Sequence, residues 1–197
     1  MKSKKPEIKI FDKIKNEEIV LDSKEELEFY EWCIEGYNNG LLNYIYHPQT
    51  FILSEEFRYD KIVKLKNKEK IVNKKLLGEH VYTPDFLIEL NDKFCELFAD
   101  SKMFMTIEKD INKFKEFPLK CYIDIKGSFQ RFDGARSFSI NQKWMWSKYS
   151  IYINKIVPEK LFKETWVPYN ATLTPKTKQI REKYKDLKLI ADVLINK

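Results

Sequence analysis

The chain has 197 residues, of which 43% are hydrophobic and 34% charged, which predicts one globular domain over residues 1–197. No apolar run is long enough to cross a membrane, and residues 1–15 lack the apolar core of a signal peptide, so we expect a cytoplasmic protein with no membrane partner. The net charge of +6 favours a polyanionic partner, and three widely spaced cysteines argue against a disulfide framework or a zinc site.

Two short strands around a polar turn are predicted for residues 7–21, and a helix follows from Ser23. Glu26 lies near the start of this helix, at the edge of its apolar stripe, and two interpretations of it are open. In the first, Ser23-x-x-Glu26 is a capping box, in which the carboxylate binds back to the start of its own helix. In the second, Glu26 points into an active site as a metal ligand or orienting base. Glu25 and Glu28 are expected to be solvated.

Residues 43–53 are rich in aromatic and apolar side chains and contain Pro48, which predicts a strand, a bend and a second strand. Residues 54–78 then turn polar and contain many lysines. One interpretation of this segment is a solvated loop or hairpin insertion. The other is a flexible basic arm that binds a nucleic-acid backbone.

A further strand is predicted for Val81 to Leu90, with Pro84 at an edge or bulge because proline cannot donate to a sheet ladder. Asp85 follows this proline directly. Residues 91–118 predict an insertion that contains a helix around residues 106–117.

The stretch over residues 121–127 predicts a short buried strand, because it is rich in β-branched and aromatic residues and a glycine ends it. Side chains alternate across a strand, so Asp124 and Lys126 share one face, and Ile123 and Ile125 share the other. A carboxylate and a lysine two positions apart, at the end of a strand, can hold a metal ion and act on a phosphate.

A loop over residues 128–137 and a helix over residues 138–149 are predicted after this strand. A loop at a strand end is well placed for phosphate contacts. The candidate DNA-binding residues of these two segments are Arg131, Arg136, Gln142 and Lys143, and the alternative for the two helix residues is a solvated face.

Residues 151–157 predict another strand, ended by Pro158. The strand–helix–strand order favours a parallel pair with a right-handed crossover. The remaining residues, 166–197, form a C-terminal extension with an irregular segment and then a lysine-rich helix over residues 176–195. This helix is expected to pack on the core, to face DNA or to serve a dimer.

Two of these motifs together carry a family resemblance. Pro84-Asp85 before an apolar strand, followed by Asp124-x-Lys126 on a second strand, resembles the PD-(D/E)xK nuclease superfamily. Glu26 on the preceding helix adds to the resemblance. The family implies an α/β fold with a restriction-endonuclease-like core, a central mixed sheet flanked by helices, over about residues 22–157. The two aspartates are 39 positions apart, which is more than the tight hairpin common in the superfamily allows.

The resemblance also implies a chemistry. Asp85, Asp124 and the backbone carbonyl of Ile125 would bind Mg²⁺ or Mn²⁺, with Glu26 as a further ligand. Lys126 would orient or deprotonate the attacking water and offset developing negative charge. Within the superfamily, the chain is most similar to phage and prophage Holliday-junction resolvase-like endonucleases, which implies branched DNA as the substrate and a homodimer.

Three alternatives remain open. A restriction-type or DNA-end-processing nuclease of the same superfamily is the first, and the scarcity of arginine argues mildly against a sequence-reading enzyme. A non-catalytic nucleic-acid-binding protein of this fold is the second, although such a protein would have little need of Asp85, Asp124 and Lys126 together. The third is a basic protein in which the motifs occur by accident.

Overall fold

The computed structural model describes residues 7–99, 101, 103–104, 118–128, 132–174 and 176–195. A four-stranded mixed sheet lies at its centre, with the strand order β10-β9-β8-β3. β8 is antiparallel to both β3 and β9, whereas β10 is parallel to β9, which confirms the parallel pair predicted above. The strands are β3 (Leu42–Tyr46), β8 (Phe86–Leu90), β9 (Leu119–Ile125) and β10 (Ile153–Ile156).

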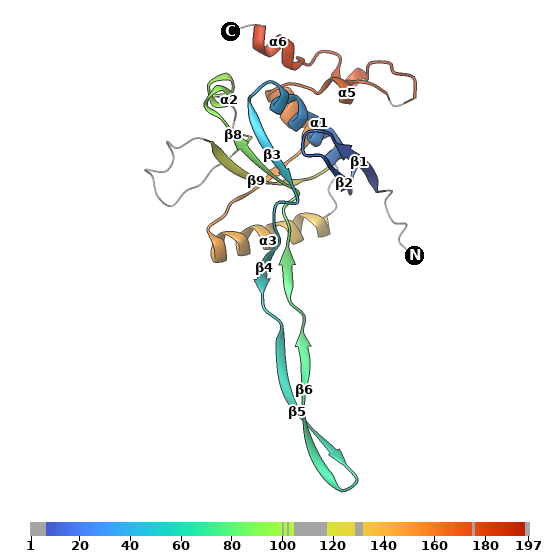
Figure 1. Ribbon diagram of the computed structural model, residues 1–197, viewed down its shortest axis with the longest axis vertical. Helices are drawn as coiled ribbons and strands as arrows, with labels where there is room; N and C mark the ends of the chain where they lie inside the picture. Colours follow the sequence, from blue (N-terminus) through green and yellow to red (C-terminus); the bar gives the residue numbers. More distant parts are fainter. Residues whose placement is uncertain are drawn as a thin grey trace.

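Two helices, α1 (Lys24–Asn38) and α3 (Phe132–Tyr149), cover opposite faces of this sheet (Figure 1). Ile123 of β9 belongs to the core that includes Phe29 of α1. The preceding residue, Tyr122, lies on the other face and packs against the cluster of Met145. The alternation along β9 thus separates two apolar layers, and a mixed α/β fold with a helix-flanked central sheet is confirmed.

An N-terminal hairpin precedes the first helix, as predicted, and consists of β1 (Ile8–Asp12) and β2 (Glu17–Leu21). Asp12 is buried at its turn, where its Oδ2 accepts a hydrogen bond of 2.6 Å from the Tyr44 hydroxyl of β3. The hairpin is therefore tied to the central sheet by a buried polar contact.

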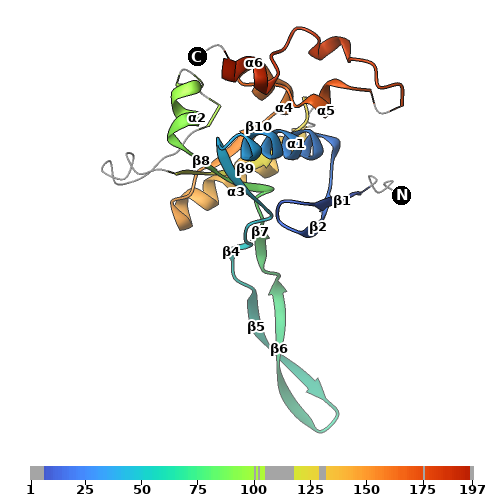
Figure 2. The ribbon, with the colours of Figure 1, turned by 45° about the horizontal axis from the view of Figure 1, so that its top comes forward.

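The lysine-rich insertion is a long hairpin that projects from the body in both views (Figures 1 and 2). This confirms the hairpin among the interpretations of residues 54–78. Its outer part, which we call the arm, consists of β5 (Phe57–Leu65) and β6 (Lys68–Leu77). A second strand pair, β4 (Phe51–Ser54) and β7 (His80–Tyr82), forms its root next to α3.

The single strand predicted for Val81 to Leu90 is wrong, because the chain leaves one sheet and enters another within it. β7 ends at Tyr82 and pairs with β4, whereas β8 begins at Phe86 and pairs with β3 and β9. Pro84 lies in the break between them, where its missing N–H leaves no gap in a ladder.

Helix α3 begins at Phe132, six positions before the predicted residue 138, so Arg136 lies on a helix and not in a loop. The insertion after β8 contains a short helix, α2 (Asp92–Leu97), whose N-cap Asn91 accepts from the N–H of Phe94. The helix predicted around residues 106–117 falls outside the described residues.

The C-terminal helix predicted for residues 176–195 is wrong. This segment instead contains an isolated bridge between Leu173 and Ile180, a 3₁₀ turn and a short last helix. Two short helices also precede it, and one of them begins at Pro158, where none was predicted. The elements are α4 (Pro158–Glu164), α5 (Tyr169–Thr172), η2 (Glu182–Tyr184) and α6 (Ile190–Ile195). No helix in the described ranges is long and apolar enough to cross a membrane.

A buried charge cluster explains why the extension folds back on α1. Glu28, predicted to be solvated, is only 6% exposed. Its Oε1 accepts from the Arg181 guanidinium at 2.7 Å, and its Oε2 accepts from the Tyr184 hydroxyl at 3.1 Å. Glu28 therefore forms a buried contact between α1 and the C-terminal extension.

Candidate active site

The register of β8 on β9 brings the two half-motifs together. Phe86 pairs with Ile123, so Asp85, one residue before the start of β8, lies beside Asp124. Asp85 Oδ2 also accepts a hydrogen bond of 2.6 Å from the backbone N–H of Ile125. The two motifs are far apart along the chain but adjacent in the fold, because β8 and β9 are antiparallel neighbours in the sheet.

Lys126 lies at the end of β9 on the same face as Asp124, as the alternation predicts. Its ammonium group forms an ion pair with Asp124 Oδ2. It also lies 5.9 Å from the centre of the Phe138 ring on α3. The backbone N–H of Lys126 donates to the Ile156 carbonyl at 2.9 Å, which continues the parallel pairing beyond the strand. Both the main chain and the side chain of this lysine are therefore held in place.

Tyr82 is a site residue that the sequence did not reveal. Its buried hydroxyl donates a hydrogen bond of 2.9 Å to Asp124 Oδ1. Burial and the charge of Asp124 raise the pKa of Tyr82, so the hydroxyl remains a donor. A tyrosine three positions before Asp85 was the available signal, because a buried tyrosine hydroxyl usually needs a partner. Only the tertiary structure shows that this partner is Asp124.

The site carries more negative than positive charge. Burial and the charge of Asp124 raise the pKa of Asp85 to about 7, and the charge of Glu26 adds to this effect. The Ile125 N–H and the Lys126 ammonium act in the opposite direction, but do not cancel it. A bound divalent cation would relieve this repulsion, so the electrostatics fit a metal site.

The donor set of the site also fits such an ion. Carboxylate and carbonyl oxygens suit Mg²⁺ or Mn²⁺, and Mg²⁺ is often held by one or two carboxylates while it keeps several waters. Asp85 and Asp124 supply the two carboxylates. Ile125, the last residue of β9, supplies the candidate backbone carbonyl. Among the residues that the structure describes, no group of three or more His, Cys, Asp or Glu could hold a metal by side chains alone.

Glu26 acts as a helix cap in the structure. Its Oε2 accepts from the Asp22 N–H and its Oε1 from the Ser23 hydroxyl, both at 2.9 Å, while Ser23 Oγ accepts from the Glu26 N–H at 3.1 Å. This reciprocal pattern confirms the capping box. Burial raises the pKa of the Glu26 carboxyl, and its charge is felt at Asp85, so it lies close to the site. Its role as a metal ligand stays a prediction.

We expect a substitution of this cap to affect stability more than catalysis. Ser23→Ala should lower the free energy of unfolding by about 1 kcal/mol, because two hydrogen bonds at the helix start are lost. Glu26→Gln keeps the size of the side chain and one acceptor, and should keep the rate of a reaction at this site within about threefold of wild type. Urea denaturation and initial reaction rates measure the two effects. A hundredfold rate loss in Glu26→Gln would instead identify a metal ligand.

The structure brings only some of the predicted DNA-binding residues to the surface. Arg136 and Lys143 are exposed on α3. Gln142 instead turns toward the sheet, where its Nε2 donates to the Ile153 carbonyl of β10 at 2.7 Å. It thus fastens α3 to the central sheet. Arg131 lies outside the described residues.

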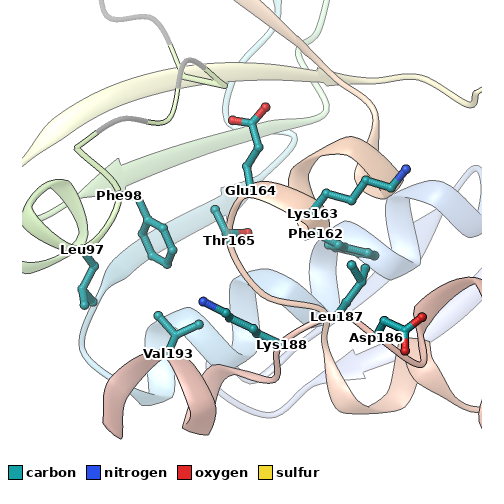
Figure 3. A pocket seen from close by; sticks show the side chains of 10 residues that line it. All are labelled: Leu97, Phe98, Phe162, Lys163, Glu164, Thr165, Asp186, Leu187, Lys188 and Val193. Carbon is teal, nitrogen blue, oxygen red and sulfur yellow. The ribbon is translucent and has the colours of Figure 1, made fainter. Parts of the chain in front are cut away.

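A cavity of about 390 Å³ lies apart from these carboxylates, between α2, α4 and the C-terminal segment (Figure 3). It is lined by apolar side chains such as Phe98, Phe162 and Leu187, together with charges of both signs, among them Lys163 and Asp186. Its lining contains none of the site residues described above, and we assign no part of the candidate site to it.

Comparisons of the chain with protein-family models, with curated proteins and with solved structures found no match. The function is therefore inferred from the site itself.

Proposed function

We propose that this protein is a metal-dependent DNA endonuclease of the PD-(D/E)xK type, selective for branched DNA such as a four-way junction. The observation that carries the proposal is the meeting of Asp85, Asp124 and Lys126 at adjacent strand ends. Accidental motifs 39 positions apart would have no reason to meet in this way. The mixed sheet with its parallel β9–β10 pair, flanked by α1 and α3, is compatible with the restriction-endonuclease-like core that the motifs predict.

Each residue has a role in this proposal. A bound Mg²⁺ or Mn²⁺ supplies polarisation of the scissile phosphate and an activated water. Asp85, Asp124 and the Ile125 carbonyl would hold the ion. Tyr82 orients Asp124 through the hydrogen bond to its Oδ1. The Lys126 ammonium, beside Asp124 Oδ2, would orient the attacking water and stabilise negative charge on the phosphate.

Branched DNA and a homodimer belong to the same proposal. Symmetric cleavage of a four-way junction requires two sites, and the resemblance to resolvase-like endonucleases implies that two copies supply them. The net charge of +6 supports a DNA partner, since phosphate contacts dominate DNA affinity. Only four arginines are present, which favours recognition of DNA shape over bidentate reading of bases.

The test is cleavage of a labelled four-way junction, a linear duplex of matched sequence and a single strand, each with and without Mg²⁺. We expect symmetric junction cuts that require the metal, with linear duplex cleaved at least about tenfold more slowly. Cleavage of linear duplex at a defined sequence would move the protein to the restriction class. Binding without cleavage of any substrate, in Mg²⁺ and in Mn²⁺, would contradict the proposed activity and leave a binding protein.

A further inference from the structure

The arm exposes apolar side chains that a surface hairpin has no structural reason to carry. Tyr59 and Leu65, toward the two ends of β5, are 42% and 48% exposed. The arm projects from its root with the β5–β6 turn at the far tip, and no other described element lies along it in either view (Figures 1 and 2). Because an isolated two-stranded hairpin gains little from its own packing, such side chains indicate a surface that binds a partner.

The two faces of the arm differ in charge. Alternation along the paired strands assigns each residue of the ribbon to one face or the other. We call one the paired face; its cross-strand pairs are Arg58–Lys75, Asp60–Asn73, Ile62–Ile71 and Lys64–Glu69. We call the other the lysine face; its cross-strand pairs are Tyr59–Lys74, Lys61–Val72, Val63–Lys70 and Leu65–Lys68.

The charges of the paired face are largely neutralised by their neighbours. Glu56 forms ion pairs with Arg58 at 2.5 Å and with Lys75 at 2.8 Å. Lys64 lies 3.7 Å from Glu69. Asp60 accepts a hydrogen bond from the Asn73 amide. This face therefore presents little net charge to a partner.

The lysine face carries four lysines and no acidic residue. Within the described part of the chain, none of Lys61, Lys68, Lys70 and Lys74 forms an ion pair. All four are exposed, and the apolar Val63 and Val72 lie between them. Uncompensated lysines in this arrangement repel one another, and a polyanion would relieve that repulsion.

We propose that the lysine face binds the phosphate backbone of duplex DNA that flanks the cleavage site. The inference rests on the proposed function for its choice of DNA as the polyanion. A second copy of the chain is a poor occupant of this face, because a symmetric contact would place lysines against lysines. A two-stranded ribbon has the dimensions to enter or follow a DNA groove. The ten residues of β6, at about 3.4 Å each, extend over about one helical turn of duplex.

The root of the arm connects this face to the candidate site. Lys148 and Tyr149 of α3 both donate to the Ile52 carbonyl of β4 at 2.7 Å. On β7, Tyr82 donates to Asp124. The arm is thus anchored beside the carboxylates, and duplex bound along it leads toward them.

The test compares two variants with equal loss of charge. K61Q/K70Q/K74Q removes three cations from the lysine face, and R58Q/K64Q/K75Q removes three from the paired face. Binding of a labelled linear duplex and a four-way junction is measured in EDTA over a series of salt concentrations, so that cleavage plays no part. We expect the lysine-face variant to lose at least tenfold in affinity, with a slope of log K against log salt reduced by two to three, because counterion release scales with phosphate contacts. The control should lose less than threefold.

Several outcomes would overturn the inference. Equal losses in the two variants would show that net charge, not one face, sets affinity. Unchanged DNA binding in the lysine-face variant, while wild type binds and cleaves DNA, would refute the arm's role and leave the proposed function intact. Wild type that binds no DNA would refute both. Selective binding of a single-stranded RNA or anionic vesicles through the same lysines would replace the partner. Melting curves of both variants that match wild type exclude misfolding as the cause.

Discussion

Replacement of Lys126 by alanine should reduce Mg²⁺-dependent DNA cleavage by about 10²- to 10⁴-fold, while DNA affinity stays within about threefold of wild type. The ammonium is in contact with Asp124 Oδ2 and is held against the Phe138 ring, so alanine removes a charge from one defined place in the site. A lysine that only attracts DNA would instead affect affinity and not the rate at saturating DNA. Single-turnover cleavage separates these two possibilities.

Lys120→Ala is the matched control for this measurement. Lys120 lies on the same strand and the same face as Lys126, and it also pairs with a carboxylate, Glu89, at 3.4 Å. It differs in lying at the far end of β9 from the two aspartates. We expect cleavage by Lys120→Ala to remain within about twofold of wild type. Equal losses in the two variants would show that the effect of Lys126→Ala is a general loss of positive charge.

Asp85→Asn should abolish cleavage and, in the absence of metal, stabilise the protein. The pKa of Asp85 is raised to about 7 in the folded protein, above its ordinary value of 3.8, so the native state binds the proton more tightly than the unfolded chain. The charged form therefore costs stability, and this cost grows as the pH rises from about 4 to about 7. Asparagine removes the charge and keeps an acceptor for the Ile125 N–H.

We expect Asp85→Asn to gain on the order of 2 kcal/mol at pH 8, which corresponds to a rise in Tm of roughly 4 °C or more for a chain of this length. At pH 5 the gain should be smaller. Glu31 also titrates near neutrality, because burial and the charges of Glu28 and Glu35 raise its pKa to about 7. The contribution of Glu31 is the same in wild type and in Asp85→Asn, so it cancels in the difference between their stabilities. A lower Tm for the variant at pH 8 would contradict the electrostatic description of the site.

Addition of Mn²⁺ or Mg²⁺ at pH 8 should reverse this order. A cation that binds only the folded state stabilises it by mass action, and it does so in wild type because the two carboxylates are both charged. We expect Tm to rise with metal concentration for wild type and to stay constant for Asp85→Asn. This readout does not depend on activity. A wild-type Tm that no divalent ion changes would show that the carboxylates do not form a metal site.

Local patterns in the sequence were sufficient for several features of this protein. The Ser23-x-x-Glu26 spacing gives the capping box as one of two interpretations of Glu26, and its hydrogen bonds join residues within one helical turn. Alternation places Asp124 and Lys126 on one face of β9, and the strand–helix–strand order predicts the parallel β9–β10 pair. Each of these features depends on residues close together in the sequence or on the handedness that all L-amino-acid chains share, so it can be predicted without knowledge of the tertiary fold.

Contacts between distant residues were decided by the tertiary structure alone. The proximity of Asp85 to Asp124 depends on the register of β8 on β9, and the hydrogen bond from Tyr82 depends on the break at Pro84 that sends β7 into another sheet. The extension forms a bridge between Leu173 and Ile180, a 3₁₀ turn and a short last helix in place of the predicted long helix, and Arg181 and Tyr184 bind Glu28 of α1. Intrinsic propensity differs by less than about 1 kcal/mol per residue among ordinary amino acids, so such non-local contacts prevail where they compete with it.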